Sequence, residues 1–279
     1  MQTFEARWQD EGGLLFYLRG WAPDRMAKAV VALVHGHGEH SRRYAHVATA
    51  FTKAGYALVG FDLRGHGLSA GPRGHAPSYS ALMDDLAAFL LHVGARFPKL
   101  PVFLYGHSLG GNLVLNFALR RKPRVRGVIA SSPWLMLTHD PPAYKLVLAR
   151  AMNALAPAFA QKSGIETAAL SRDAAIVKAY EHDSLVHDRI SARMFTAIYE
   201  SGLWALDHAA EFPVPLLLMH GTGDRIASAE ASRQFASRGG TSVTARYWKG
   251  WYHELHNEPG HDRLFAAMLK WMDGVLRRK

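Results

Sequence analysis

The sequence predicts an α/β protein with a mostly parallel β-sheet, flanked by helices and interrupted by one helical insertion. Short, almost continuously apolar runs are typical of strands that are buried on both faces of a parallel sheet. These runs are residues 30–34, 56–61, 102–105, 125–130 and 214–219. Segments with helical periodicity separate most of them, as the connections of a parallel sheet require. This alternation stops between Pro133 and Pro213, where about eighty residues of helical, apolar-rich sequence intervene.

The size and composition of the chain fit one core that carries an insertion. The chain has 279 residues, of which 49% are hydrophobic, and this is enough for a large buried core. We therefore expect a core of residues 1–132 and 213–279, with residues 133–212 forming a helical cap over the carboxyl ends of the strands. Cysteine is absent, which excludes disulfides, thiolate catalysis and thiolate metal ligands.

The remaining elements of the core can be predicted in chain order. Residues 3–9 and 14–21 alternate apolar and polar side chains around Gly12-Gly13, which predicts an antiparallel hairpin at the sheet edge. Ser78 is a suitable N-cap for a helix over residues 79–96, whose apolar side chains recur with helical periodicity. The other expected elements are helices over 44–54, 228–237 and 261–278 and a strand over 243–248.

The insertion contains an apolar stripe of four side chains, Leu148, Met152, Leu155 and Phe159. This stripe has two interpretations that the sequence leaves open. It either packs onto the body of the protein or forms a lid whose apolar face lines a channel for an acyl chain.

The chain is basic, and its charge alone does not identify a partner. The formal net charge is +10, and the basic residues are scattered apart from small clusters at 120–122 and 277–279. A solvated basic surface is the simplest interpretation, and attraction to anionic lipid is the functional alternative. The sequence has no motif for nucleic-acid recognition, so we expect no nucleic-acid partner.

No targeting or membrane-spanning segment is predicted. Residues 1–13 include acidic side chains and lack an apolar core, unlike a secretory signal. No stretch approaches the roughly 18 apolar residues that a membrane-spanning helix needs. We expect a cytoplasmic protein whose contact with membranes is peripheral and made through the cap, while the oligomeric state stays open.

A nucleophilic serine is predicted at the end of the strand over 102–105. The sequence GHSLG at 106–110 follows this strand, and a helical pattern continues from there to Pro123. This is the G-x-S-x-G turn of a nucleophile elbow, which exposes the hydroxyl of Ser108 above the sheet. The two glycines fit because a Cβ atom at either position would collide with the neighbouring strand or helix. The helix that starts after Ser108 directs free N–H groups at an oxyanion formed beside it.

A serine nucleophile needs a histidine to accept its proton and a carboxylate to orient that histidine. Asp224 lies just after the last apolar run, where the chain order of such sites places the carboxylate. His253 comes 29 residues later, on the predicted loop before the last helix. We therefore predict a catalytic triad of Ser108, Asp224 and His253. The weaker candidates for the acid and the base are Asp140, Asp207, His256 and His261.

The other half of an oxyanion hole is predicted in the glycine-rich loop at 35–38, directly after the first apolar run. The expected donors are the backbone N–H groups of His37 and Leu109. The close spacing of His35, His37 and His40 also raises the question of a metal site. A glycine loop after a strand is not a preorganised metal cage, so we expect no metal and no other cofactor.

Six motifs occur in an order that is more specific than any one of them. They are HGHGEHSRRY (35–44), FDLRGHGLSAGPRG (61–74), GHSLGG (106–111), LSRD (170–173), HGTGDRI (220–226) and YHELHNE (252–258). In this order the sequence resembles the monoacylglycerol lipase and lysophospholipase-like serine hydrolases, which have the α/β-hydrolase fold. The resemblance implies the same triad and the same oxyanion donors as the residues themselves.

The resemblance also implies contacts with the polar headgroup of a substrate, made by Glu39, Arg43 and Tyr180. The alternative interpretation is structural, because Glu39 and Arg43 can pair with each other and Tyr180 can simply pack. His37 departs from the small or aliphatic residue often seen at its position in the family.

The expected function is cleavage of a lipid ester, specifically of monoacylglycerols into fatty acid and glycerol through an acyl-enzyme intermediate. The nearest alternative is a lysophospholipase or a carboxylesterase of broad specificity, because fold and triad do not determine the leaving group. A different class of function is a catalytically silent ligand-binding protein on the same fold. No cofactor is needed for the predicted chemistry.

Overall fold

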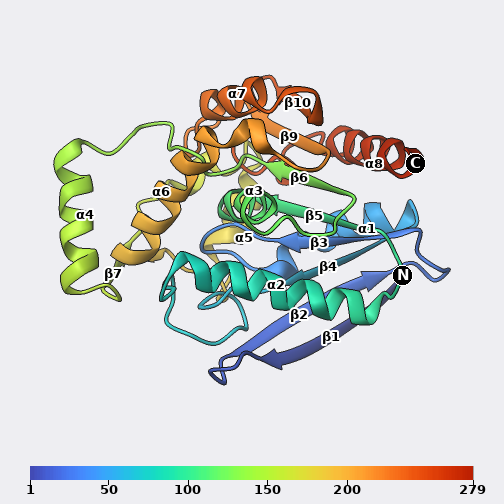
Figure 1. Cartoon of the computed structure of the whole chain (residues 1–279), viewed down its shortest axis with the longest axis horizontal. Helices are drawn as coiled ribbons and strands as arrows, with labels where there is room; N and C mark the ends of the chain where they lie inside the picture. The colour runs from blue at the N-terminus through green and yellow to red at the C-terminus, as the bar shows by residue number, and fades with distance from the viewer. Residues whose placement is uncertain (279) are drawn as a thin grey trace.

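The computed structural model describes residues 1–278, and its centre is an eight-stranded sheet (Figure 1). The strand order is β1-β2-β4-β3-β5-β6-β9-β10. The strands are β1 (Gln2–Gln9), β2 (Leu15–Ala22), β3 (Ala29–Val34), β4 (Tyr56–Phe61), β5 (Val102–His107), β6 (Gly127–Ser131), β9 (Leu216–Gly221) and β10 (Val243–Trp248). β1 and β2 form an antiparallel hairpin, β2 pairs antiparallel with β4, and all other neighbours are parallel. The predicted edge hairpin and mostly parallel sheet are therefore confirmed.

Helices cover both faces of this sheet. Side chains of β3 alternate between two apolar clusters: Val31 and Leu33 belong to the cluster of α1 and α8, and Val30 to that of α2, α3, α6 and α7. A strand buried on both faces explains why the run over 30–34 has no polar residue. The helices of the core are α1 (Ala45–Lys53), α2 (Tyr79–Arg96), α3 (Leu109–Arg121), α7 (Ala229–Arg238) and α8 (Asp262–Arg277). The Ser78 side chain caps α2 as predicted and accepts from the N–H of Ala81 at 3.0 Å.

The segment between β6 and β9 contains three α-helices, two single-turn 3-10 helices and a small second sheet. Its α-helices and strands are α4 (Ala143–Leu155), β7 (Ala160–Lys162), α5 (Ala174–Glu181), β8 (Arg189–Ser191) and α6 (Ala192–Asp207). β7 and β8 pair antiparallel, which the sequence did not predict because three-residue strands are too short to show a periodicity. Figure 1 shows α4 standing away from the sheet, with α6 between them.

α6 and α4 are held very differently. The amides of Asn112 and Asn116, both on α3, donate to the carbonyl oxygens of Ile198 and Ser201 on α6 at 3.2 and 3.1 Å. α6 is therefore fastened directly to the helix that follows Ser108. α4, in contrast, has no buried residue.

Among residues 1–278, no helix combines the length and the apolar character that crossing a lipid bilayer requires.

Candidate active site

The turn between β5 and α3 holds Ser108 in a conformation that few L-residues adopt. Its backbone angles are φ +53° and ψ −114°, which is typical of a nucleophile elbow. A Cβ atom on Gly106 would lie 2.2 Å from the carbonyl oxygen of Gly110, and one on Gly110 would lie 2.0 Å from that of Val34. The close approach of β5, α3 and β3 therefore requires glycine at both positions, as predicted from the sequence.

Ser108, His253 and Asp224 form one chain of hydrogen bonds. His253 Nε2 lies 2.9 Å from Ser108 Oγ, and His253 Nδ1 lies 2.7 Å from Asp224 Oδ2. All three residues are buried. Burial disfavours the imidazolium, but the neighbouring Asp224 carboxylate outweighs it and raises the pKa of His253 above its usual value. This imidazole is placed to take a proton from Ser108 and to hold it.

Asp224 accepts four hydrogen bonds, one of them from a histidine that the sequence analysis did not single out. Oδ1 accepts from the amides of Ile226 and Ala227 at 2.8 and 3.0 Å, while Oδ2 accepts from His253 and, at 3.0 Å, from His220. Burial raises the pKa of Asp224, but its two histidine partners outweigh burial and hold the pKa well below the usual range. The signal available was a histidine at the end of a strand, four residues before the predicted acid.

The predicted alternatives to the acid and the base do not join this chain. Asp207 pairs with Arg238 at 3.5 Å and is largely exposed. The buried imidazole of His256 has no hydrogen-bond partner among the described residues, and Nδ1 of His261 lies 3.0 Å from the carbonyl oxygen of Glu258. Of the candidates, only His253 therefore makes a hydrogen bond with Ser108.

The two predicted oxyanion donors come from different elements. Leu109 is the first residue of α3, directly after Ser108, and His37 lies in the loop after β3. Within residues 1–278, the amides of His37 and Leu109 have no hydrogen-bond partner. The amide before that of His37 is held firmly, because the N–H of Gly36 donates to Glu39 Oε1 at 2.6 Å. His35 fixes the same loop from the other side by accepting from the amide of Leu63 at 2.9 Å.

A small space lies directly at Ser108, and a much larger one lies in the inserted segment. The small space is about 10 Å³ in volume, and Glu39, Tyr180 and Ile165 are among the residues that line it. The larger cavity is about 920 Å³ in volume and is lined mainly by apolar side chains between positions 137 and 195, including Met152 and Phe195. Gly164 lines the large cavity and Ile165 the small one, so adjacent residues border the two spaces.

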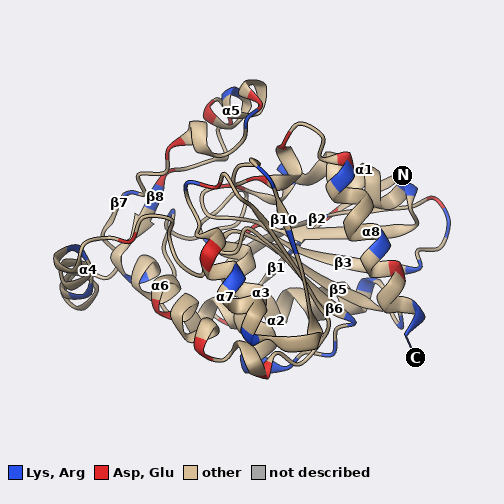
Figure 2. Cartoon of the chain, turned by 90° about the horizontal axis from the view of Figure 1, so that it is seen from above, with Lys and Arg blue, Asp and Glu red and all other residues tan. Residues whose placement is uncertain are grey.

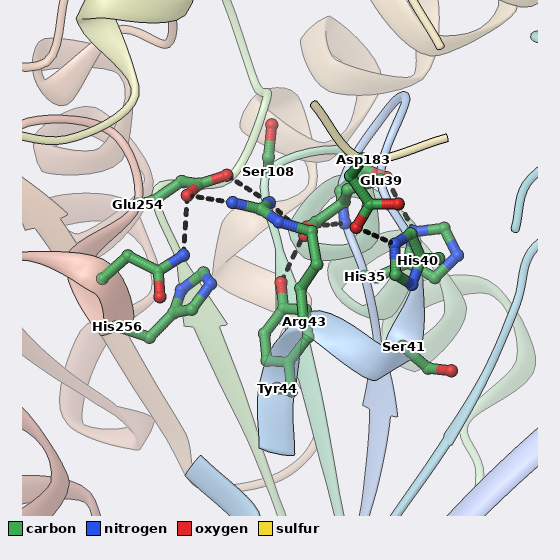
Figure 3. A network of polar contacts seen from close by, with 12 residues as sticks. His35, Glu39, His40, Ser41, Arg43, Tyr44, Ser108, Asp183, Glu254 and His256 are labelled. Atoms are coloured by element: carbon green, nitrogen blue, oxygen red, sulfur yellow. Dashed lines mark hydrogen bonds and ion pairs between the residues drawn. The ribbon is translucent and has the colours of Figure 1, made fainter. Parts of the chain in front are cut away.

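The three residues implied for headgroup contact lie together near Ser108, and two of them, Glu39 and Arg43, are shown in Figure 3. Glu39 and Tyr180 border the small space, whereas Arg43 is not among the residues that line it. Arg43 Nη1 donates to Glu39 Oε2 at 2.7 Å, and the guanidinium lies 4.7 Å from the centre of the Tyr180 ring. Arg43 also pairs with Glu254, a contact that the sequence analysis did not foresee.

The LSRD motif lies against the loop that carries His253. The carbonyl oxygen of Leu170 accepts from the amide of Glu254 at 2.8 Å, and the hydroxyl of Ser171 donates to the carbonyl oxygen of Asn257 at 2.8 Å. The amide of Arg172 donates to Glu258 at 2.8 Å. The inserted segment is thus hydrogen-bonded to the histidine loop at three successive positions.

Of the three clustered histidines after β3, His35 and His40 have separate partners, and both ring nitrogens of His37 lack a hydrogen-bond partner among the described residues. His35 contacts Leu63, and His40 Nε2 lies 2.9 Å from Asp183. In the part of the chain that the structure describes, no group of three or more His, Asp or Glu side chains is arranged to hold a metal ion.

An eight-stranded α/β fold with a serine on a strand-to-helix turn, hydrogen-bonded to histidine and through it to aspartate, defines the class of α/β-hydrolase serine hydrolases. The comparison with known families agrees with this class. The profile of the Hydrolase_4 family, described as serine aminopeptidase S33, matches residues 25–260, and the chain belongs to this family.

Several relatives cover nearly the whole chain. A monoacylglycerol lipase of Mycolicibacterium smegmatis is 32% identical over 94% of this chain and 94% of its own length. A phospholipase of Bacillus subtilis is 30% identical over 91% of this chain and 98% of its own length. An uncharacterised abhydrolase domain-containing protein of Dictyostelium discoideum is 36% identical over 91% of this chain, but the match spans only 27% of that longer protein.

The fold is also similar to that of a solved structure, the monoacylglycerol lipase of Paleococcus ferrophilus. The two share 31% sequence identity with a TM-score of 0.85, over 99% of this chain and 100% of the other.

Proposed function

We propose that this chain is a carboxylic ester hydrolase that cleaves monoacylglycerols into fatty acid and glycerol. The observation that carries this proposal is the hydrogen-bonded chain of Ser108, His253 and Asp224. It lies beside the amides of His37 and Leu109, which have no hydrogen-bond partner within residues 1–278. The monoacylglycerol lipases among its relatives of similar length support the choice of substrate.

The acylation step uses the two contacts of His253. Ser108 Oγ attacks the ester carbonyl while its proton passes to His253 Nε2, and Asp224 stabilises the imidazolium through Nδ1. The amides of His37 and Leu109 hold the oxyanion of the tetrahedral intermediate. Collapse of the intermediate breaks the bond to the glycerol oxygen, which takes the proton from His253 and leaves the acyl group on Ser108.

Deacylation repeats these steps with water as the nucleophile. His253 takes a proton from the water, the oxyanion forms again between the same two amides, and collapse releases the fatty acid with Ser108 Oγ protonated. Every proton transfer in both steps uses the imidazole of His253, so this reaction needs no cofactor.

We propose that residues 133–212 act as the cap and that the cavity of about 920 Å³ takes the acyl chain. Leu148, Met152 and Phe159 of the predicted apolar stripe border this cavity, and an apolar lining suits a hydrocarbon chain. Leu155, the fourth member of the stripe, does not border the cavity and is 83% exposed.

We propose that the polar end of the substrate contacts Glu39 and Tyr180. Both border the space at Ser108. A carboxylate and a phenol can accept and donate hydrogen bonds to the free hydroxyls of glycerol.

We also propose peripheral contact between α4 and a membrane that carries the lipid substrate. Large apolar side chains on and just after α4 are more than half exposed, namely Tyr144, Val147, Leu148, Leu155 and Phe159. The only charged residues of α4 are Lys145 and Arg150, which suits an anionic surface. Elsewhere basic and acidic residues are interspersed on the helices (Figure 2).

The proposed function is tested by turnover of monoacylglycerols with acyl chains from C8 to C18, beside p-nitrophenyl acetate and lysophosphatidylcholine. We expect hydrolysis of monoacylglycerols to be fastest and to depend on Ser108, with Ser108→Ala slower by roughly a thousandfold or more. Faster turnover of lysophosphatidylcholine would favour the phospholipase activity of the Bacillus subtilis relative. Wild-type rates in Ser108→Ala would contradict the mechanism itself.

A further inference from the structure

Arg43 lies between two buried carboxylates that are far apart in the sequence (Figure 3). Its Nη1 atom donates to Glu39 Oε2 at 2.7 Å and to Glu254 Oε1 at 2.6 Å, and its Nη2 atom donates to Glu254 Oε2 at 2.8 Å. Only 10% of the Arg43 side chain is exposed, with 2% and 3% for Glu39 and Glu254. The three side chains therefore form an ion triad out of contact with bulk water.

Each carboxylate of this triad belongs to a loop that carries a catalytic group. Glu39 accepts from the amide of Gly36 and so fixes the peptide that precedes the proposed oxyanion donor, His37. Glu254 directly follows His253 in the chain. Arg43 is the residue that joins the two loops, since it is the common donor to both carboxylates.

The remaining contacts of the two carboxylates keep their orientation fixed. Glu39 Oε1 accepts from the hydroxyl of Tyr44 at 2.8 Å, and Glu254 Oε2 accepts from the side-chain Nδ2 of Asn257 at 2.7 Å. Arg43 itself is covered on one side by the ring of Tyr180. With both hydrogens of Nη1 engaged and no contact with the space at Ser108, the guanidinium is directed at the carboxylates and not at a substrate.

We propose that Arg43 is a positioning residue that clamps the oxyanion loop to the histidine loop through Glu39 and Glu254. The clamp keeps the amide of His37 and the imidazole of His253 in place around Ser108 throughout the reaction. This inference rests on the proposed function for the roles of His37 and His253, but it does not depend on the headgroup of the substrate.

The energetics of such a triad favour a role in geometry over a role in stability. Removing three charges from water costs about as much as their attraction returns, so buried ion pairs add little net stability. Their value is that the planar guanidinium fixes two carboxylates in one geometry. Oxyanion donors and a general base that are already in place need no reorganisation when charge develops in the transition state.

The triad also affects the charge that His253 experiences. The titratable groups that face His253 are Asp224, Glu254, Glu39 and His107. Two carboxylates against one guanidinium leave a net negative charge on this side of the imidazole. Burial lowers the pKa of His253, while Asp224 and then Glu254 and Glu39 raise it. Neutralising Glu254 is therefore expected to lower the pKa of His253.

The test uses Glu254→Gln, which weakens one arm of the clamp while Arg43 keeps its pairing with Glu39. The substrates are monocaprylin, which has a glycerol headgroup, and p-nitrophenyl butyrate, which has none. We expect kcat to fall roughly tenfold or more on both substrates, with each KM within about threefold of wild type. The inhibition constant of butylboronic acid, which mimics the tetrahedral intermediate, should rise by the same factor as kcat/KM falls.

Two further readouts belong to the same experiment. The acidic limb of kcat/KM should move to lower pH in Glu254→Gln, because the variant lacks the negative charge of Glu254 that raises the pKa of His253. Arg43→Lys keeps the positive charge but cannot bond Glu254 in bidentate fashion, so it should retain more activity than Arg43→Met on both substrates.

A matched control is the ion pair of Arg64 with Asp85, which is bidentate and largely buried but lies outside the site. Asp85→Asn should lower the denaturation midpoint and leave kcat/KM unchanged. If it lowers kcat/KM as much as Glu254→Gln does, the loss reflects general destabilisation and the clamp is refuted.

Other outcomes also overturn the clamp. A higher KM for monocaprylin with p-nitrophenyl butyrate unaffected would make these residues headgroup contacts, as the family resemblance implies for Arg43. Unchanged kinetics on both substrates would make the triad dispensable. If wild type hydrolyses p-nitrophenyl butyrate but not monocaprylin, the proposed substrate is wrong, while the butyrate and boronic acid measurements still test the clamp.

Discussion

Asp224 has donors on both carboxylate oxygens, so neighbouring groups, and not solvent, set its charge and orientation. One of these donors to Asp224 is His220, which takes no part in the proton transfers of a serine hydrolase. Its Nε2 lies 3.0 Å from Asp224 and 3.1 Å from the carbonyl oxygen of Ala227, so this nitrogen carries a hydrogen. Its Nδ1 lies 2.7 Å from the hydroxyl of Ser232, which fixes the ring from behind.

Replacing His220 with leucine is expected to reduce kcat by roughly tenfold, with little change in KM. Without this donor the Asp224 carboxylate becomes a stronger acceptor for His253 and raises the pKa of His253 further. The acidic limb of the rate profile should therefore move to higher pH. His220→Gln can still donate toward Asp224 and should restore most of the rate. A pH profile of kcat/KM for the three proteins checks this, and an unshifted limb in His220→Leu would count against it.

Some residues of the site could be predicted from the sequence and others could not. Ser108, Asp224 and His253 were predictable because each follows a recognisable strand in a fixed chain order. His220 and Glu254 lay inside quoted motifs, yet their roles depend on contacts with Asp224 and Arg43 that only the tertiary structure creates. Local patterns carry no information on such pairs.

The elements of the inserted segment differ in how firmly they are attached. α6 is bonded to α3 by two asparagine side chains, whereas α4 packs against α6 without burying any of its own residues. An element with few buried contacts has a low local stability. Motion of the segment is therefore expected to begin at α4, on the side of the large cavity.

Leu155→Asp tests the membrane contact proposed for α4. Leu155 is 83% exposed, so the change disturbs no packing but places a charge on the apolar surface. We expect binding to vesicles that contain phosphatidylglycerol to weaken roughly tenfold, from lost apolar burial and charge repulsion. Hydrolysis of water-soluble p-nitrophenyl acetate should stay the same. Leu91→Asp on α2, 76% exposed in the free protein, is the control that should bind like wild type, and equal binding by all three proteins would refute the contact.

For the whole molecule, the sheet and its helices could be predicted from the sequence, because strands buried on both faces leave short, almost continuously apolar runs. The strand predicted over 125–130 begins two residues later, at Gly127 in β6, since apolar character alone does not locate where pairing starts. The pairing of β7 with β8 and the distinct attachments of α4 and α6 were not predictable, because they depend on contacts between segments that share no periodic signal.

The stability of the whole molecule should fall as the solution becomes mildly acidic. Burial lowers the pKa of His37 to about 3 and that of His107 to about 4. Between about pH 6 and 4 the unfolded chain binds a proton at each of these histidines, while the folded chain does not. Protons therefore favour unfolding, and stability that is present above the unfolded pKa is lost as the pH falls through this window.

Each such histidine contributes a slope of about 1.4 kcal/mol per pH unit to the free energy of unfolding in that window. Asn does not titrate there, so His107→Asn should reduce the measured slope by about that amount. Urea denaturation at pH 6, 5 and 4 provides the measurement. A slope equal to that of wild type would mean that His107 is already protonated in the folded protein.

The three hydrogen bonds between the LSRD segment and the histidine loop limit how this architecture can be recombined. A segment between β6 and β9 that is grafted from a relative brings its own version of residues 170–172, and these must match residues 254–258 of the recipient. Chimeras that exchange this segment alone should have a displaced His253, whereas those that also exchange residues 254–258 should keep His253 in place. The two stretches therefore act as one structural unit, although more than eighty residues of chain separate them.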